Sequence, residues 1–384
     1  MDKYVEYSSQ SWLSRLGGSL KNIFGGIVLL LVSIIILWWN EGRAVKTARG
    51  LEEGADLVVN LDKPTLEDSN NEKLIHVQGD VVSDEKLQDD EFNIATNGLR
   101  LKRTVEMYQW KENSKSETKK KVGGGQETIT EYTYEKVWSN ELINSNKFSK
   151  KNGHQNPSSI PYDNFEINAS NVYLGDFKIS DEILNKLSDY ENLSITGKQS
   201  TSFDIIKETE DNHQVDKLFK GTGTKSNPDI GDIKVSFYHI PSNTYSIIGQ
   251  QKEHSITPYL TESNTEILMV SEGNVNAKQM FQNAMESNSV MTWILRFLGF
   301  LIMFVSFIAM GSFLPTVADV IPFIGSIVGL GVKIFSGVVS FLLSFVIIGI
   351  AWIYYRPILG GILIVTGLAV GLFFYKRSLN SRSV

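Results

Sequence analysis

The chain has 384 residues, enough for two or three domains, and carries 43 acidic against 37 basic residues for a formal net charge of −6. It contains no cysteine, which excludes disulfide bridges, thiolate metal sites and a cysteine nucleophile. The charge is uneven: residues 41–292 hold 40 acidic and 28 basic residues, a formal −12, and the two ends carry +6. This composition is typical of a membrane protein with one large aqueous domain, and it argues against nucleic acid as a partner of that domain.

The first long apolar run covers residues 23–39. As a helix it would reach about 25 Å, which crosses a bilayer core of about 30 Å once the flanking residues are included. It ends at Trp38 and Trp39, whose rings favour the headgroup level of a membrane. A cleaved signal peptide would have a short apolar core and a small-x-small site, whereas this run continues into Asn-Glu-Gly-Arg. The sequence therefore predicts a transmembrane helix at 23–39 after a cytosolic segment at 1–22.

The junction that follows this helix contains Asn40, Glu41, Gly42, Arg43 and Lys46. Arg43, Lys46 and Arg49 are spaced by three, so a helical run would place them roughly along one face, where they could meet lipid headgroups or the acidic domain. A solvated, membrane-facing strip is the alternative interpretation. We consider Asn40, Glu41, Gly42, Arg43 and Lys46 candidate structural residues that fasten the helix to its domain.

The region 40–292 has the pattern of a β-rich extracytoplasmic or lumenal domain. Runs of β-branched and aromatic residues with partial alternation predict strands at 73–82, 99–110, 127–138, 232–240 and 244–251. A charged loop with three consecutive glycines joins the second strand to the third, and a Pro-Ser-Asn turn separates the last two as a further pair. Short helices are expected at 181–189 and 276–287, because each opens with an acid or amide at its cap.

Three more apolar runs follow the domain, at 294–314, 334–354 and 358–375. Arg296 lies near the start of the first, where a long side chain can reach the interface. Arg356 and Pro357 separate the last two. Because proline cannot continue a helix and arginine must lie near water, we expect them to form the turn of a tight helical hairpin.

The segment 315–333 is apolar but contains two prolines, Asp319 and Lys333, so an interfacial or re-entrant helix is expected there rather than a fifth span. The predicted fold class is α+β, a membrane protein with four transmembrane helices and a large β-rich extramembrane domain inserted between helices 1 and 2. Four spans put both termini on one side. Seven lysines and arginines near the membrane on that side against five on the other favour cytosolic termini, including the tail at 376–384.

Motifs for catalysis or for cofactor and metal binding give no candidate residues. The Gly-Thr-Gly-Thr-Lys sequence at 221–225 lacks the phosphate-loop spacing. The five histidines show no metal-ligand spacing, and no Gly-x-Ser-x-Gly motif marks a serine nucleophile. The carboxylates are explained by a solvated acidic surface. We therefore predict no enzymatic activity, no cofactor and no metal.

Two glycine pairs in the membrane part are candidate interface residues. Gly325 with Gly329, and Gly367 with Gly371, lie one helical turn apart, which lets the backbone of another helix approach closely. Such pairs pack either within one bundle or between protomers, and the sequence is compatible with both arrangements.

Several stretches taken together resemble the transmembrane protein 43 family, also called LUMA, in their order and spacing. They are NEGRAVKTA (40–48), LKRTVEMYQW (101–110), WSNELINSNKF with GHQNP (138–157), GDIKVSF (231–237) and YYRP (354–357). The resemblance extends over about residues 15–375.

The resemblance implies a four-span protein of the endoplasmic reticulum and inner nuclear membrane, with cytosolic or nucleoplasmic termini and a lumenal loop. Animal members self-associate and bind lamins and emerin in nuclear envelope organisation, a channel or signalling role has been proposed for them, and the family has no established enzymatic activity. The lack of cysteine, the richness in Lys, Asn and Ile and the different loop at 111–126 would suit a bacterial member. Such a member would lie in the plasma membrane, and lamins and emerin are partners only of a eukaryotic one.

We therefore expect a non-enzymatic, self-associating multi-pass scaffold whose partners are the lipid bilayer, copies of itself and other membrane proteins. A channel or transport component is the alternative, because Arg296, Asp319, Lys333 and Arg356 are the charges of the C-terminal membrane region and intramembrane ionisable groups often mark a pathway. An enzyme with a site in the 40–292 domain is the third hypothesis.

Overall fold

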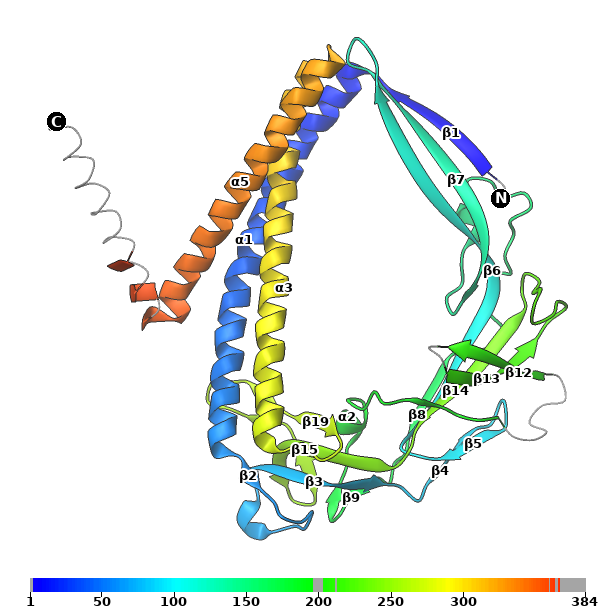
Figure 1. Ribbon diagram of the computed structural model, residues 1–384, viewed down its shortest axis with the longest axis vertical. Helices are drawn as coiled ribbons and strands as arrows, with labels where there is room; N and C mark the ends of the chain where they lie inside the picture. Colours follow the sequence, from blue (N-terminus) through cyan, green and yellow to red (C-terminus); the bar gives the residue numbers. More distant parts are fainter. Residues whose placement is uncertain (1–2, 196–202, 211–212, 359, 363–364, 367–384) are drawn as a thin grey trace.

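The computed structural model describes residues 3–195, 203–210, 213–358, 360–362 and 365–366. Three long helices run side by side along one flank of the molecule, and two β-sheets extend from one end of them (Figure 1). The protein is thus α+β, as predicted. The described part contains three helices long and apolar enough to cross a membrane. Most of the fourth predicted span, 358–375, and the tail at 376–384 lie outside the described residues.

Helix α1 (Trp12–Leu57) is much longer than the predicted span at 23–39. It begins where the Ser11 hydroxyl accepts a hydrogen bond from the Ser14 amide, and it ends where the Val58 amide donates to the Gly54 carbonyl. Beyond the apolar run, buried residues continue at helical spacing against helix α3. With 46 residues, α1 is about 69 Å long. The predicted junction is therefore the middle of a continuous helix.

Helix α3 (Ala277–Gly311) joins the predicted helix at 276–287 to the predicted span at 294–314 without interruption. Short helix α4 (Phe313–Ala318) follows, and α5 (Pro322–Tyr355) begins with Pro322 in its first turn, where a proline is tolerated. The segment 315–333 is therefore not a separate helix. One part of it belongs to α4, and residues 322–333 continue directly into the predicted span at 334–354 because α5 is unbroken through them.

The first sheet is antiparallel throughout, with strand order β1-β7-β6-β14-β13-β12 and with β11 and β8 added beside β14 and β6. Its strands are β1 (Lys3–Gln10), β6 (Arg100–Lys120), β7 (Gln126–Ser139), β8 (Phe165–Asn168), β11 (Glu191–Asn192), β12 (Asp204–Glu210), β13 (His213–Lys220) and β14 (Ile233–Ile240). The predicted strands at 99–110 and 127–138 are confirmed as a hairpin joined by the glycine loop.

The second sheet has the order β19-β15-β16-β10-β9-β3-β2, with β15 also pairing β3. Its strands are β2 (Val59–Asn60), β3 (Leu74–Val82), β9 (Tyr173–Leu174), β10 (Phe177–Lys178), β15 (Asn243–Lys252), β16 (Ser255–Thr257) and β19 (Met269–Glu272). Two small hairpins complete the β structure, namely β4 (Lys86–Asp89) with β5 (Ile94–Asn97) and β17 (Tyr259–Leu260) with β18 (Glu266–Ile267).

Two local predictions need correction. Strands β14 and β15, expected as a pair around Pro-Ser-Asn, belong to different sheets, because β14 pairs with β6 and β15 with β3. The short turn therefore carries the chain from one sheet to the other, and both strands are largely buried. The predicted helix at 181–189 is only the single turn α2 (Asp181–Leu184), after which the Lys186 and Leu187 amides bond to carbonyls three residues back. Short 3₁₀ turns lie at Asp68–Asn70 and Ser145–Lys147.

Three strands extend out of the first sheet as a ribbon, which we define as β1 with residues 111–120 of β6 and 126–135 of β7. It is polar on both faces. One cross-strand row is Val5, Glu131 and Lys115, and the next row, on the opposite face, is Glu6, Thr130 and Ser116. The 21 residues of β6 reach about 70 Å, so the ribbon returns to the end of the helices at which α1 begins (Figure 1).

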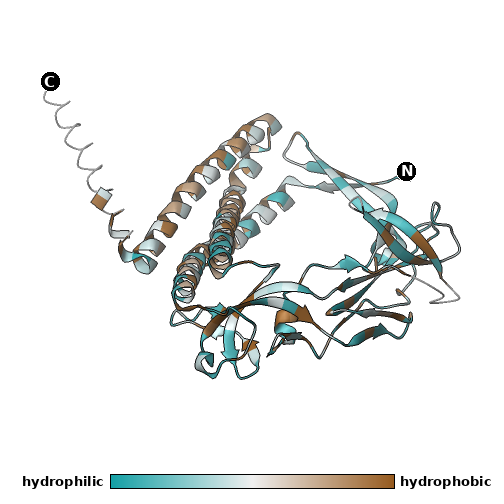
Figure 2. Ribbon diagram, turned by 60° about the horizontal axis from the view of Figure 1, so that its bottom comes forward, coloured by the Kyte–Doolittle hydropathy of each residue, from teal (hydrophilic) through white to brown (hydrophobic). Residues whose placement is uncertain are grey.

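The hydrophobic core has four clusters, three at the sheet end of the molecule and one between the helices. One of them joins the sheets to the helices: Leu74 and Ile248 of the second sheet pack with Leu51 of α1 and Phe281 of α3. Another holds the helices together around Leu37. The outward faces of the helices remain apolar, and Figure 2 shows hydrophobic residues along them while the ribbon is mostly hydrophilic.

Candidate functional site at the buried ion pairs of the helices

A single carboxylate of the predicted junction connects the three long helices. Glu41 of α1 is fully buried and accepts hydrogen bonds from Arg296 of α3, at 2.6 Å from Nε and 2.8 Å from Nη2. Its Oε2 also accepts from the Trp352 indole N–H of α5 at 2.7 Å. A buried charge is stable only when it is paired and hydrogen-bonded, and a two-pronged arginine contact supplies both. Glu41 therefore fixes the relative positions of α1, α3 and α5.

Aromatic rings surround this ion pair. The Arg296 guanidinium lies 4.7 Å from the ring centroid of Trp293 and 5.6 Å from that of Trp352, both within cation–π distance. Trp38 contacts Tyr354 and Tyr355 with ring centroids 5.8 and 5.7 Å apart. Trp and Tyr favour the interface of a membrane, so these rings are suited to the headgroup level.

Asn40 and Arg43 bind α1 to α3 through polar contacts. The Arg43 guanidinium donates to Asn288 Oδ1 at 2.9 Å and to Thr292 Oγ1 at 3.0 Å. Asn40 Nδ2 donates to the Thr292 carbonyl at 3.0 Å, and Asn40 Oδ1 accepts from Arg43 at 3.2 Å. The first predicted residues of the junction thus lie in the contact between two helices.

Gly42, Lys46 and Arg49 have different environments. A Cβ at Gly42 would lie 2.7 Å from Cζ of Tyr355, so the absence of a side chain lets α5 approach α1. Arg49 is exposed and donates to the Tyr355 carbonyl at 3.1 Å. The Lys46 side chain is exposed, and its carbonyl accepts from Thr265. Arg43, Lys46 and Arg49 therefore do not form the single exposed basic face that was expected, because the Arg43 side chain lies in the contact of α1 with α3.

The chain bends at the residues predicted to form the helical turn. Helix α5 ends at Tyr355, and Arg356 has a non-helical backbone with φ −133° and ψ 67°. Helical structure resumes at Pro357. The Arg356 guanidinium lies 5.9 Å from the Trp352 ring centroid, so Arg356 and Pro357 are close to the ion pair of Glu41.

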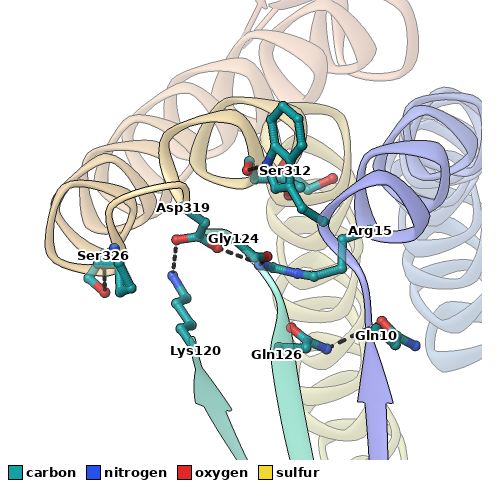
Figure 3. A network of polar contacts seen from close by, with 11 residues as sticks. Gln10, Arg15, Lys120, Gly124, Gln126, Ser312, Asp319 and Ser326 are labelled. Carbon is teal, nitrogen blue, oxygen red and sulfur yellow. Dashed lines mark hydrogen bonds and ion pairs between the residues drawn. The ribbon is translucent and has the colours of Figure 1, made fainter. Parts of the chain in front are cut away.

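A second buried carboxylate lies at the other end of the helices, where α4 meets α5. Asp319 is 1% exposed and contacts Arg15 Nη2 at 2.5 Å and Lys120 Nζ at 2.6 Å, as Figure 3 shows. Arg15 comes from the start of α1, and Lys120 is the last residue of β6, directly before the tip of the ribbon. An isolated carboxylate in an apolar segment requires such partners.

The ribbon tip, residues 121–125, is built to dock at this point. The Gly124 carbonyl accepts from Arg15 Nη1 at 2.5 Å, and the Gly123 amide donates to the Val320 carbonyl at 3.1 Å. Gly124 has φ +81°, and a Cβ there would lie 2.3 Å from Cδ1 of Trp12. Only glycine accommodates both this backbone conformation and this contact.

The predicted glycine pairs contribute unequally to the described structure. A Cβ at Gly325 would lie 1.8 Å from Asp319 Oδ1, and one at Gly329 would lie 3.6 Å from Pro315 Cβ. These two positions therefore face α4 and the residue after it within the same chain. Gly367 and Gly371 lie outside the described residues.

Sequence reasoning missed the glycines at which α1 and α3 meet. A Cβ at Gly26 would lie 2.8 Å from the Ser306 carbonyl oxygen, and one at Gly299 would lie 2.6 Å from Leu37 Cδ2. It also missed Arg15, Lys120 and Trp352 as partners of the buried carboxylates. The available signal was that Asp319 and Glu41 need partners, but nothing local indicates which residues supply them.

The four charges considered for a pathway do not form one cluster, although Arg296 and Arg356 lie 5.6 and 5.9 Å from the centroid of the same Trp352 ring. Arg296 is paired at the domain end of the helices and Asp319 at the opposite end. Lys333 is exposed on α5, and Arg356 follows its last residue.

Histidines and tyrosines of the β structure have structural hydrogen bonds. Burial lowers the pKa of His76, which contacts Asn60 Oδ1 at 3.0 Å and the Val275 carbonyl at 2.9 Å. Burial likewise lowers the pKa of His239 and raises that of Tyr245, which donates to Asp189. Among the described residues, no group of three or more His, Asp or Glu side chains could hold a metal ion. The site is therefore a pair of helix-fastening ion clusters.

Known proteins match along most of the chain. The family model of Transmembrane protein 43 matches residues 107–357. Human Transmembrane protein 43 is 30% identical over 378 residues, which cover 95% of this chain and 92% of the human protein. The mouse protein is 30% identical over 370 residues (93% and 90%), and the Drosophila melanogaster homolog is 26% identical over 359 residues (92% and 93%). No solved structure matches.

Proposed function

This chain belongs to the transmembrane protein 43 family, and from that premise we propose that it is a non-enzymatic, self-associating membrane scaffold that organises other membrane proteins. The observation that carries the proposal is the joining of three apolar helices through the buried Glu41. This joint fixes the helices relative to one another, and the cluster around Leu51, Leu74 and Phe281 attaches the β-rich body to them, which gives the rigid frame that a scaffold requires. Lamins and emerin are proposed partners only if the protein is eukaryotic.

Two features support self-association. β1 is the outer strand of the first sheet, and an edge strand offers backbone donors and acceptors to another chain. The outward faces of α3 and α5 carry large exposed apolar side chains, which a bilayer or a second copy would cover. For the orientation we propose that the end of the helices at which α1 begins lies on the cytosolic side, on the basis of the lysine and arginine distribution.

Energy transfer between labelled copies tests self-association. Val122 at the ribbon tip is 91% exposed, and the chain has no native cysteine, so Val122→Cys gives a single labelling position. Donor- and acceptor-labelled chains are reconstituted together at falling protein-to-lipid ratios. We expect transfer to persist on dilution with lipid and to fall when excess unlabelled chain is added. Transfer that falls to the random-encounter level at low density would refute self-association.

A second candidate function, a channel or transport component, is favoured by the ribbon. A bilayer centred on residues 23–39 would place the ribbon at the level of the hydrocarbon layer, because its tip contacts Arg15 on the far side of that stretch. Open sheet edges with polar faces are not stable against lipid. A docked ribbon in the membrane would therefore be bathed by water, as in a conducting path.

Ion flux from liposomes tests this second candidate. Asp319→Asn weakens the dock of the ribbon on the helices, and we expect it to change the flux if the ribbon lines the path. Lys333→Gln is the matched control. It also removes one charge, and Lys333 is exposed on α5 away from the ribbon dock. Absence of flux in the wild-type protein would remove the candidate.

A further inference from the structure

An apolar groove of about 600 Å³ lies between α3 and α5. Its walls are mainly aromatic rings, namely Trp293, Phe297 and Phe300 from α3 and Phe341, Phe345 and Trp352 from α5. Phe297 and Phe345 are more than half exposed, so the rings border open space. The hydroxyl of Ser344 also borders the groove, but it turns inward and donates to Met303 Sδ at 3.6 Å. The groove therefore suits a hydrocarbon chain.

One end of the groove is cationic. Arg296 lies there, and its charge is balanced by Glu41. The Arg356 guanidinium lies 5.9 Å from the centroid of the same Trp352 ring that lines the groove, and Arg49 contacts the Tyr355 carbonyl beside it. Among the described residues, neither Arg356 nor Arg49 forms an ion pair, which leaves an excess of positive charge at the mouth.

This mouth lies where a lipid phosphate would be. Trp293 and Trp352 line it beside Arg296, Trp38 and Tyr354 contact each other at the same end of the helices, and such rings prefer the headgroup level. From there the groove follows α5 from Trp352 back to Phe341, about 17 Å along the axis. A groove that begins with positive charge at the interface and continues with aromatic walls into the hydrocarbon layer matches a phospholipid in both charge and shape.

We propose that the α3–α5 groove is a binding site for one acyl chain of an anionic phospholipid whose phosphate interacts with Arg356. Hydrocarbon tails of bulk lipid are as apolar as the groove, so burial alone gives no selectivity. Selectivity comes from the charge at the mouth. Arg356 would contribute about a fivefold preference for an anionic over a zwitterionic lipid, which is the effect of one basic residue near a membrane surface, about 1 kcal/mol.

Native mass spectrometry of the full chain, titrated with phosphatidylglycerol or phosphatidylcholine of equal chain length, measures this preference. The blocking variant is Gly349→Leu, because Gly349 lines the groove and its Cβ position has no atom within 4 Å. The Cβ of the added side chain therefore meets no clash, and the rest of the side chain extends into the groove. Gly331→Leu is its matched control, since Gly331 is also on α5, has no atom within 4 Å and does not line the groove.

We expect the wild-type protein and Gly331→Leu to bind phosphatidylglycerol preferentially, and Gly349→Leu to lose this bound lipid. Arg356→Gln should lower the preference about fivefold while phosphatidylcholine still binds. Lys333→Gln, which removes a cation of α5 that does not line the groove, should leave the preference unchanged. Equal retention of phosphatidylglycerol by Gly349→Leu, or no preference in the wild-type protein, would overturn the proposal.

A photoreactive residue in place of Phe345 identifies the occupant directly in native-like membranes. A cross-link to lipid supports the proposal. A cross-link to residues 358–375 of the same chain, or to a second copy, would show that protein fills the groove and would overturn it.

Discussion

Neutralising Glu41 gives the sharpest test of how the helices are joined. In Glu41→Gln, the new side chain keeps an oxygen that can accept from Trp352, but its amide group cannot pair with Arg296. Glu41 is fully buried and the Arg296 side chain is 12% exposed, so water cannot replace the lost partner. Removing one member of a buried ion pair leaves the other uncompensated and costs about 3–5 kcal/mol. We expect Glu41→Gln to lower the free energy of unfolding by about 3 kcal/mol.

The assay is unfolding in mixed micelles, followed by tryptophan fluorescence, because Trp293 and Trp352 flank the ion pair. Glu131→Gln is the control. Its ion pair with Lys3 has the same 2.6 Å separation, but the two side chains are 42% and 57% exposed. An exposed pair of this kind contributes about 0–1 kcal/mol.

A double-mutant cycle with Arg296→Met separates the ion pair from general damage. Once both charges are gone, no buried charge is left unpaired, so the double variant Glu41→Gln/Arg296→Met should be more stable than the sum of the single effects predicts. The reasoning is refuted if Glu41→Gln costs no more than Glu131→Gln, or if the two single effects simply add.

Three further outcomes are expected. Gly26→Ala should destabilise the contact of α1 with α3 by about 1–3 kcal/mol, because its Cβ would lie 2.8 Å from the Ser306 carbonyl oxygen. Gly25→Ala is the control: its Cβ position has no atom within 4 Å, so it should be neutral or stabilising in the same unfolding assay. Because burial lowers the pKa of His76 below its ordinary 6.5, the folded state favours the neutral ring. The contribution of the neutral His76 ring to the free energy of unfolding should therefore be fully present above the pKa of the unfolded state and be lost as pH falls toward the lowered pKa of the folded state. When Tm is measured from pH 8 to 5, the decrease in Tm should be smaller for His76→Gln than for the wild-type protein. The pair Ser8→Cys/Thr128→Cys should form a disulfide in membranes, because these residues are direct partners in β1 and β7. The control pair Ser8→Cys/Thr118→Cys should not, because Thr118 lies on β6, two strands away from β1. Equal cross-linking of both pairs would contradict the register.

Local patterns in the sequence were sufficient for the elements with strong periodicity. The apolar run before Trp38 and Trp39 requires a membrane or a covered helix face, and the alternating β-branched residues of β3, β6 and β7 require a half-buried strand. The same reasoning located the break at Arg356, since Pro357 cannot continue a helix. It also indicated that Asn40, Glu41 and Arg43 have a structural role, although not what they contact.

The lengths and partners of these elements were decided by tertiary contacts. Helix α1 continues to Leu57 because its polar second half packs on α3, which weakens any apolar signal in the sequence. Strands β14 and β15 have the pattern of a hairpin, yet β14 pairs with β6 in the first sheet and β15 with β3 in the second. Nothing near Gly26 or Gly299 in the sequence distinguishes them from other glycines, because their role depends on the helix that packs against them.

Sequence alone determined the class of this protein, its apolar helices, its β-rich acidic body and the bend after α5, because each follows from residues within one or two turns of each other. Only the tertiary structure decided that Arg15 and Asp319, 304 positions apart, form an ion pair, and that Glu41 meets Arg296 across 255 positions. A buried charge dictates that some opposite charge must come to it. Which one arrives depends on how the whole chain packs, and that information is not contained in any local stretch.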